Sequence, residues 1–296
     1  MILGNTGGEM GERIRAFDWS LTPLGSIRHW PQSLRTVVNI LLSSRYAMWM
    51  AWGPELTMLY NDAYGPTLGI KHPRALGMRA SDVWAEIWPD IGPRIETVLT
   101  TGTATYDEGL LLFLERSGFP EETYHTFSYS PLADDEGRIS GMLCVVTEET
   151  ERVIGERRVE TLRALASALA TTNNEDEVFL RAIREKLSLN KKDLPFTLTY
   201  LFDGGGGVEA GAARLACSTG FSPGHPLAPE LIEPGSDFPW PAHRIFLHSA
   251  SPVLDDLSEQ RKVAPLPTGD WNTPPTQASL VPILSRGRSN RPGFSL

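Results

Sequence analysis

Six histidines are the side chains of this sequence with the widest chemical range. They are His29, His72, His125, His225, His243 and His248. His243 and His248 are five residues apart, and this spacing does not place them on one helical face as two metal ligands would be. We therefore predict no metal site. His125 lies in a strand-like run and is interpreted as a structural histidine first, and as a pocket-lining residue or haem ligand second.

The acidic pairs are interpreted as solvated loop charges. Asp134-Asp135-Glu136 and Glu121-Glu122 both fall in turns, whereas acid–base catalysis needs carboxylates held in a pocket with shifted pKa values. The Gly-x-Ser-x-Gly sequence of a hydrolase elbow does not occur. We therefore assign no catalytic residue, and whether the chain belongs to an enzyme stays open.

Neither the cysteines nor the glycine run indicates a cofactor. Cys144 and Cys217 have no Cys-x-x-Cys partner and are expected to be reduced and packed. Cys144 also lacks the motif that surrounds the reactive cysteine of flavin photosensors. The glycines at 204–207 are followed by Val208-Glu209 rather than by the Lys-Ser/Thr of a phosphate loop. No haem, flavin or metal motif is visible, so the cofactor is unknown.

Composition favours a globular protein of two domains. The chain has 296 residues, 41% hydrophobic and 21% charged, with a net charge of −9. This acidic balance argues against nucleic acid as a partner. No run reaches the ~18 apolar residues of a membrane span, and no secretory leader is visible. We therefore expect a cytoplasmic location.

The elements that must position any site follow from hydrophobic periodicity. Helices are expected over 32–44 and 91–102, and strands over 46–52, 56–60, 105–116, 123–132 and 139–148. Asn61 is expected to cap a short helix after the second strand, and Gly102 to end the longer helix. This order predicts an α+β domain, in which a five-stranded antiparallel sheet carries helices on one face.

A pocket between the sheet and its helices is a common place for a small ligand. The aromatic residues near it are interpreted as core first and as pocket lining second. The pocket candidates are Trp49, Tyr60, Asn61, Tyr64, Phe113, His125, Phe127 and Tyr129.

Changes in composition, charge and hydrophobic pattern divide the chain into four parts. A flexible lead-in is expected over 1–16, a first domain over 17–147, a connector helix over 148–170 and a second domain over 171–296. The connector helix carries Val159, Leu162, Ala166 and Leu169 at a 3-4 spacing, and a homodimer through this face is a hypothesis. The final RPGFSL is expected to be an apolar strand that leaves an open sheet edge.

Several segments together carry a family resemblance. DWSLTPLGS, WPQSLRTVVNILLSS, WGPELTMLYNDAYGPTLGIKHPRALG, VWAEIW and FLERSGFPEETYHTFSYSPLADDEGRISGMLCVVTEETERV resemble the N-terminal PAS domain of bacterial PAS–GAF sensor histidine kinases, over about residues 17–170. Residues 171–296 resemble the first part of a GAF domain. The resemblance implies a sensor of a two-component phosphorelay. Its connector helix would transmit a conformational signal to a kinase or another output domain, in cis or in trans.

The sequence departs from this family in its missing output. It shows no phosphoacceptor histidine on a His-Glu helix and no ATP-binding boxes, which indicates a detached or truncated sensor half. The output could instead be a PP2C-type phosphatase. A stand-alone interaction module is a second alternative, and a pocket filled by side chains would favour it. A non-functional fragment is a third.

Overall fold

The chain folds into two compact units, residues 1–154 and 155–296, in a computed structural model that describes residues 8–170, 176–202, 212–241, 253–283 and 293–295. The first unit contains α1 (Gly8–Ala16), η1 (Trp19–Leu21), η2 (Ile27–His29), α2 (Gln32–Ser43), β1 (Ala47–Trp52), β2 (Thr57–Tyr60), η3 (Asp62–Tyr64), α3 (Gly65–Leu68), η4 (Gly69–Lys71), α4 (Ala80–Val83), α5 (Trp88–Thr101), β3 (Thr105–Leu114), β4 (Glu121–Ala133) and β5 (Ile139–Glu148). Helix α6 (Thr150–Ala170) follows directly and contains the boundary between the units.

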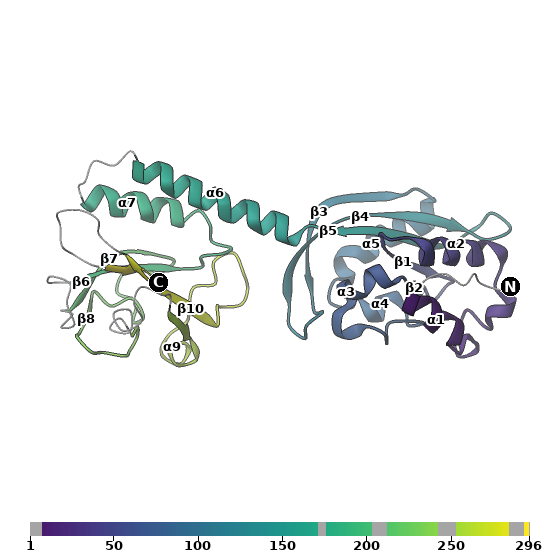
Figure 1. The fold of residues 1–296 in the computed structure, drawn as a ribbon, viewed down its shortest axis with the longest axis horizontal. Coiled ribbons are helices and arrows are strands. Elements are labelled where there is room, and N and C mark those ends of the chain that lie inside the picture. The colour runs from purple at the N-terminus through teal and green to yellow at the C-terminus, as the bar shows by residue number, and fades with distance from the viewer. Residues whose placement is uncertain (1–7, 171–175, 203–211, 242–252, 284–292, 296) are drawn as a thin grey trace. The chain divides into compact units, whose positions relative to one another are not determined.

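The first unit is built on a five-stranded sheet of order β2-β1-β5-β4-β3, and every pairing is antiparallel. The predicted α+β domain is therefore confirmed. The first strand lies between the second and the fifth, so that β5 is the central strand and β2 and β3 are the edge strands. Helix α5 contacts β3, β4 and β5, and it lies with α3 and α4 along one face of the sheet (Figure 1).

The helix cap, the helix end and the buried helix face that the sequence predicts are all present in this unit. The side chain of Asn61 caps η3 by accepting a hydrogen bond from the backbone N–H of Tyr64 at 3.2 Å. Gly102 follows α5 with φ of 68°, a left-handed conformation that glycine adopts without steric cost. The apolar stripe of α2 is buried through Leu34, Val38 and Leu41.

The N-terminus differs from the expected flexible lead-in. Residues 1–7 lie outside the described part, but Gly8–Ala16 form α1, with Met10 and Ile14 fully buried. The carboxylate of Asp62 accepts a hydrogen bond from the Met10 backbone N–H at 2.6 Å. Burial of two apolar side chains and this cap stabilise a helix that nine residues alone would hardly form.

The second unit contains another antiparallel sheet. Its elements are α7 (Asp176–Leu187), β6 (Thr197–Phe202), β7 (Ala213–Thr219), β8 (Leu231–Ile232), β9 (Val253–Asp256), α9 (Ser258–Val263), β10 (Gln277–Ile283) and β11 (Gly293–Ser295). The strand order is β8-β7-β6-β11-β10-β9. The expected open edge at RPGFSL is wrong, because β11 pairs with β6 on one side and β10 on the other. The glycines at 204–207 and His243 and His248 lie outside the described residues.

Candidate functional site

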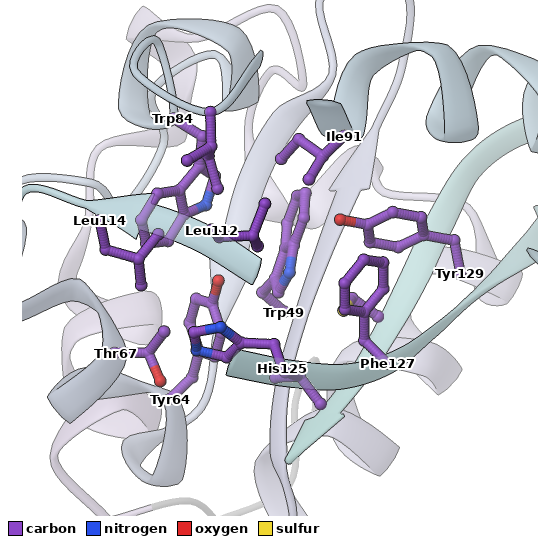
Figure 2. Close-up of a pocket in the computed structure, with 13 residues that line it drawn as sticks. Trp49, Tyr64, Thr67, Trp84, Ile91, Leu112, Leu114, His125, Phe127 and Tyr129 are labelled. Atoms are coloured by element: carbon purple, nitrogen blue, oxygen red, sulfur yellow. The ribbon is translucent and has the colours of Figure 1, made fainter. Parts of the chain in front are cut away.

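A small aromatic cavity lies between the sheet of the first unit and its helices. Its volume is about 30 Å³, which is room for about two water molecules. Figure 2 shows side chains from the sheet and from the helical segments converging on it. The lining residues are Trp49, Tyr64, Thr67, Trp84, Ile87, Ile91, Leu112, Leu114, His125, Phe127, Tyr129, Cys144 and Val146.

Five of the eight pocket candidates from the sequence line this aromatic cavity. They are Trp49, Tyr64, His125, Phe127 and Tyr129. The rings of Trp49 and Tyr64 stack with centroids 6.3 Å apart, and Tyr129 meets Trp49 edge to face at 5.9 Å. Aromatic packing of this kind fills most of the space.

Two other candidates are buried elsewhere. The Tyr60 hydroxyl lies 3.0 Å from Nδ1 of His72, away from the lining set. Both the oxygen and the nitrogen of the Asn61 side-chain amide form hydrogen bonds with backbone groups. Its Oδ1 accepts from the N–H groups of Met48 and Tyr64, and its Nδ2 donates to the carbonyls of Leu41, Ser44 and Tyr46. Asn61 therefore joins α2, β1 and η3.

The last candidate, Phe113, points out of the domain and is 42% exposed. The cause is a β-bulge between Asp107 and Leu110, at which three steps along β3 face two along β4. One extra residue in a strand exchanges its two faces beyond that point. Leu112 and Leu114 consequently line the cavity, and Phe113 does not.

His125 is the polar residue that distinguishes the cavity from ordinary core. It is only 2% exposed, and among the described residues neither ring nitrogen has a hydrogen-bond partner. Burial lowers its pKa to about 4, although the Glu148 carboxylate opposes this shift. The imidazole is therefore neutral at pH 7 and offers one donor and one acceptor.

The other ionisable groups of the cavity are also uncharged. Burial raises the pKa values of Tyr64, Tyr129 and Cys144 well above their ordinary values. Both Cys144 and Cys217 are free and buried, as the sequence predicts, and a protonated buried thiol is unreactive. The cavity can bind a neutral molecule, and its thiol and phenol groups remain protonated.

A polar cluster beside the cavity joins the sheet to α6. Arg116 binds both carboxylate oxygens of Glu148 at 2.7 and 3.0 Å, and its Nε donates to Glu121 at 3.0 Å. Thr150, the first residue of α6, donates to Glu148 at 2.8 Å and accepts from the backbone N–H of Tyr124 at 3.0 Å. We call these four side chains, Arg116, Glu121, Glu148 and Thr150, the Arg116 cluster.

The Arg116 cluster lies next to His125 in the sheet. Glu148 is the cross-strand partner of His125, and the backbone of Tyr124, the preceding residue, also accepts from the N–H of Glu149 at 2.8 Å. Burial alone would raise the pKa of Glu148, but the hydrogen bonds from Arg116 and Thr150 bring it below its ordinary value. The carboxylate that holds the start of α6 is thus ionised and adjacent to the cavity histidine.

The part of α6 that belongs to the second unit is held there by another arginine. Arg157 donates to both carboxylate oxygens of Asp193 at 2.9 and 2.6 Å, and Asn190 donates to the same Asp193 and to Thr161. The predicted packing face is open along the described helix: Val159 is 45% and Leu162 64% exposed, and Ala166 is also exposed. The side chain of Leu169 lies outside the described residues.

Sequence reasoning missed the aliphatic and helical half of the lining. Trp84 lies before the predicted helix over 91–102, and nothing in its local pattern indicates that it points toward a cavity. Ile91 is the first residue of that predicted helix, but the predicted lining did not include it. Cys144 was interpreted as a small buried hydrophobe. Its alternation with Val146 along β5 places both on the inner face and could have indicated the lining.

Comparison with known proteins assigns the class of the first unit. Residues 42–154 match the family model described as PAS fold, and the chain therefore contains a PAS domain, the sensory domain that the sequence resemblance predicts. No curated protein matches the chain. In the part of the chain that the structure describes, no helix is both long and apolar enough to cross a membrane.

Three solved structures illustrate the similarity. The PAS domain of BvgS from Bordetella pertussis is 16% identical, covering 45% of this chain and 98% of that one, with a TM-score of 0.30. A sensory box sensor histidine kinase from Vibrio cholerae is 14% identical, covering 39% and 89%, with a TM-score of 0.29. An RNA-binding Light-Oxygen-Voltage receptor is 20% identical, covering 46% of this chain but only 38% of that one, with a TM-score of 0.33.

Proposed function

We propose that this chain is a sensory module in which the state of the aromatic cavity biases helix α6 and, through it, an output domain in cis or in trans. The observation that carries the proposal is the Arg116 cluster. It ties the first residue of α6 to the strand that presents His125 to the cavity. A change in cavity packing that moves β4 or β5 acts directly on the groups that hold the helix.

The mechanism is a population shift between two arrangements of the helix start. A ligand or partner changes this balance only as far as it prefers one arrangement. Arg116 links a third element, because its backbone carbonyl accepts from the N–H of Ile70 at 2.9 Å. The η4 segment thus contacts the backbone of the same arginine that holds the carboxylate at the start of α6.

The wider assignment follows the sequence resemblance. We propose that the second unit is GAF-like and that the module serves two-component signalling in the cytoplasm, with a histidine kinase as output. Sheet order supports the first part: β6 lies between β7 and β11, as β1 lies between β2 and β5. Another output enzyme, such as a PP2C-type phosphatase, would use the same coupling.

A stand-alone interaction module is the second candidate. The observation that favours it is the size of the cavity, about 30 Å³, which is far below the ~300 Å³ at which ligand pockets begin. In that case a protein partner on the surface, rather than a ligand inside, sets the position of α6. Both candidates share the Arg116 cluster and differ in the input.

Hydrogen exchange of the purified chain tests the coupling. Glu148→Gln removes the carboxylate that Arg116 and Thr150 bind, and we expect the amides of the first two turns of α6 to exchange about tenfold faster, since charge-assisted hydrogen bonds are worth 1.5–3 kcal/mol. Glu136→Gln is the matched control, because Glu136 pairs with Arg138 in an exposed hairpin. Equal exchange of α6 in both variants would refute the proposal.

A further inference from the structure

Three of the eight buried side-chain polar atoms that lack a hydrogen-bond partner in the described part of the chain belong to residues that line the aromatic cavity. Both ring nitrogens of His125 and the indole nitrogen of Trp84 are buried without a hydrogen-bond partner among the described residues. Both residues line the cavity, and Trp84 is 1% exposed. Figure 2 shows the His125 ring and the Trp84 indole on different sides of the same space. Buried polar groups in native proteins are nearly always paired, so the two ring nitrogens of His125 call for a partner that occupies the cavity. The indole N–H of Trp84 interacts with the Tyr64 hydroxyl, which also lines the cavity, and an occupant can take this N–H as a second donor.

The donors and acceptors available in the cavity restrict the chemical groups that this partner can carry. The indole N–H of Trp84 can only donate, whereas the neutral imidazole of His125 has one donor and one acceptor. An occupant therefore needs an acceptor for Trp84, and it can use a donor or an acceptor toward His125. A carbonyl oxygen can accept hydrogen bonds from both Trp84 and His125, and a carboxamide adds an N–H group that can donate to the other imidazole nitrogen.

The charge of the lining residues and the volume of the cavity restrict the occupant further. None of the lining side chains carries a formal charge at pH 7, since His125 is neutral and burial keeps the lining tyrosines and Cys144 protonated. An ion would lose its hydration there without a counter-charge. A volume of about 30 Å³ admits only a few non-hydrogen atoms beside the aromatic walls.

We propose that the aromatic cavity binds a small neutral carbonyl or carboxamide compound, which accepts a hydrogen bond from Trp84 and hydrogen-bonds to the imidazole of His125. This inference rests on the proposed sensory function, because it names the ligand class for the same cavity. Replacing water at these groups changes the surroundings of β4, which is the strand that the Arg116 cluster ties to α6.

The test uses formamide as the probe and the imidazole ¹⁵N resonances of His125 as the readout, on the full ¹⁵N-labelled chain at about pH 7. Formate is the matched control, because it has the same number of non-hydrogen atoms but carries a charge. The ceiling on binding free energy per atom makes ~1 mM the tightest Kd of a three-atom ligand, and we take ~10 mM as the expected Kd. We expect a saturable shift with formamide and none with formate.

Variants locate the binding. His125→Phe should abolish the saturable effect on the neighbouring backbone amides, whereas His29→Phe, an equal change at an exposed position, should preserve it. Trp84→Phe keeps most of the ring and removes the N–H, and it should weaken formamide binding about tenfold, the cost of leaving a carbonyl unpaired. Trp84→Phe also provides a second reading if His125→Phe does not fold.

Three results would overturn the inference. They are no saturable shift up to about ten times the expected Kd, equal responses to formamide and formate, and unchanged binding in Trp84→Phe. Each would leave water as the occupant or place the binding elsewhere. The exchange test of Glu148→Gln uses no ligand, so a failure here is separate from a failure of the coupling between the sheet and α6.

Discussion

His125 combines deep burial with a titratable ring, and its protonation state is linked to the stability of the PAS domain. The folded protein holds its pKa at about 4, whereas the unfolded chain restores the ordinary value of 6.5. Between these values the unfolded state binds more protons than the folded state. The contribution of the neutral ring is therefore complete above pH 6.5 and is lost as the pH falls toward 4.

This linkage predicts the pH dependence of unfolding. Between about pH 7 and about pH 5 the free energy of unfolding should fall by about 2 kcal/mol on account of His125. Urea denaturation at both pH values measures the loss. In His125→Phe this part of the loss should vanish, and in His29→Phe it should remain. An equal loss in all three proteins would show that His125 does not titrate in this way.

Asn61 is a structural residue at the corner of the domain. Asn61→Ala leaves three carbonyls and two N–H groups without their side-chain partner. We expect the free energy of unfolding to fall by about 3 kcal/mol, since each buried unsatisfied group costs about 1–3 kcal/mol and water reaches some of them. Urea denaturation measures it, and a loss below about 1 kcal/mol would contradict the role of Asn61 as the joint between α2, β1 and η3.

The sequence allowed residues on one face of β4 to be grouped because strand alternation is local, and Phe127 and Tyr129 share that face with His125. Trp49 alternates with other large side chains along β1 and is predicted only as one of the aromatic residues near the pocket. Phe113 was assigned to the wrong side because the bulge in β3 involves Gly109, which has φ of 57°, and no pattern reports such a shift. The role of Asn61 as a cap was predicted, but its three bonds to carbonyls depend on tertiary contacts.

At the scale of elements, one arginine–carboxylate pair lies at the start of α6, and a second involves Arg157, about two turns further along the helix. Arg116 and Glu148 act at its start, and Arg157 and Asp193 act within the second unit. A helix transmits a displacement only if both attachments are firm. The sequence predicted a connector helix over 148–170 from its charge and spacing, but neither ion pair could be predicted, because the partners are distant in sequence.

The pair in the second unit gives a test with a neighbouring control. Arg157→Met removes both hydrogen bonds to Asp193 from a largely buried site, and we expect the second unit to lose about 1–3 kcal/mol of stability. Arg158→Met should change little, because Arg158 is mostly exposed and lies 3.8 Å from the same carboxylate. Urea denaturation followed by a probe in the second unit compares them, and equal losses would contradict this assignment.

The N-terminal helix shows why the elements at the edge of the domain were harder to predict. Met10 and Ile14 are four residues apart, which is the spacing of one helical face. Two glycines and several charges in the same nine residues obscure that pattern. The helix is stabilised by Asp62 and by the core, which are features of the folded domain rather than of the segment.

At the scale of the whole molecule, the exposed face of α6 bears on assembly. Val159 and Leu162 are apolar and open to solvent in the described chain. The proposed homodimer through this face predicts that Leu162→Glu lowers the mass measured in solution toward that of one chain, because a charge cannot be buried unpaired at low cost. Leu21→Glu changes an exposed leucine elsewhere and is the control. Equal masses for Leu162→Glu and the unchanged chain would reject this interface.

The central claim is that the aromatic cavity and α6 are coupled through the Arg116 cluster, and a double-mutant cycle measured by hydrogen exchange tests it most directly. Leu112→Ala enlarges the cavity without touching the cluster. Alone, it should change the exchange of the first two turns of α6 at least fivefold, a typical coupling. In the Glu148→Gln background the same change should have almost no effect on α6. An equal effect of Leu112→Ala in both backgrounds would contradict the account.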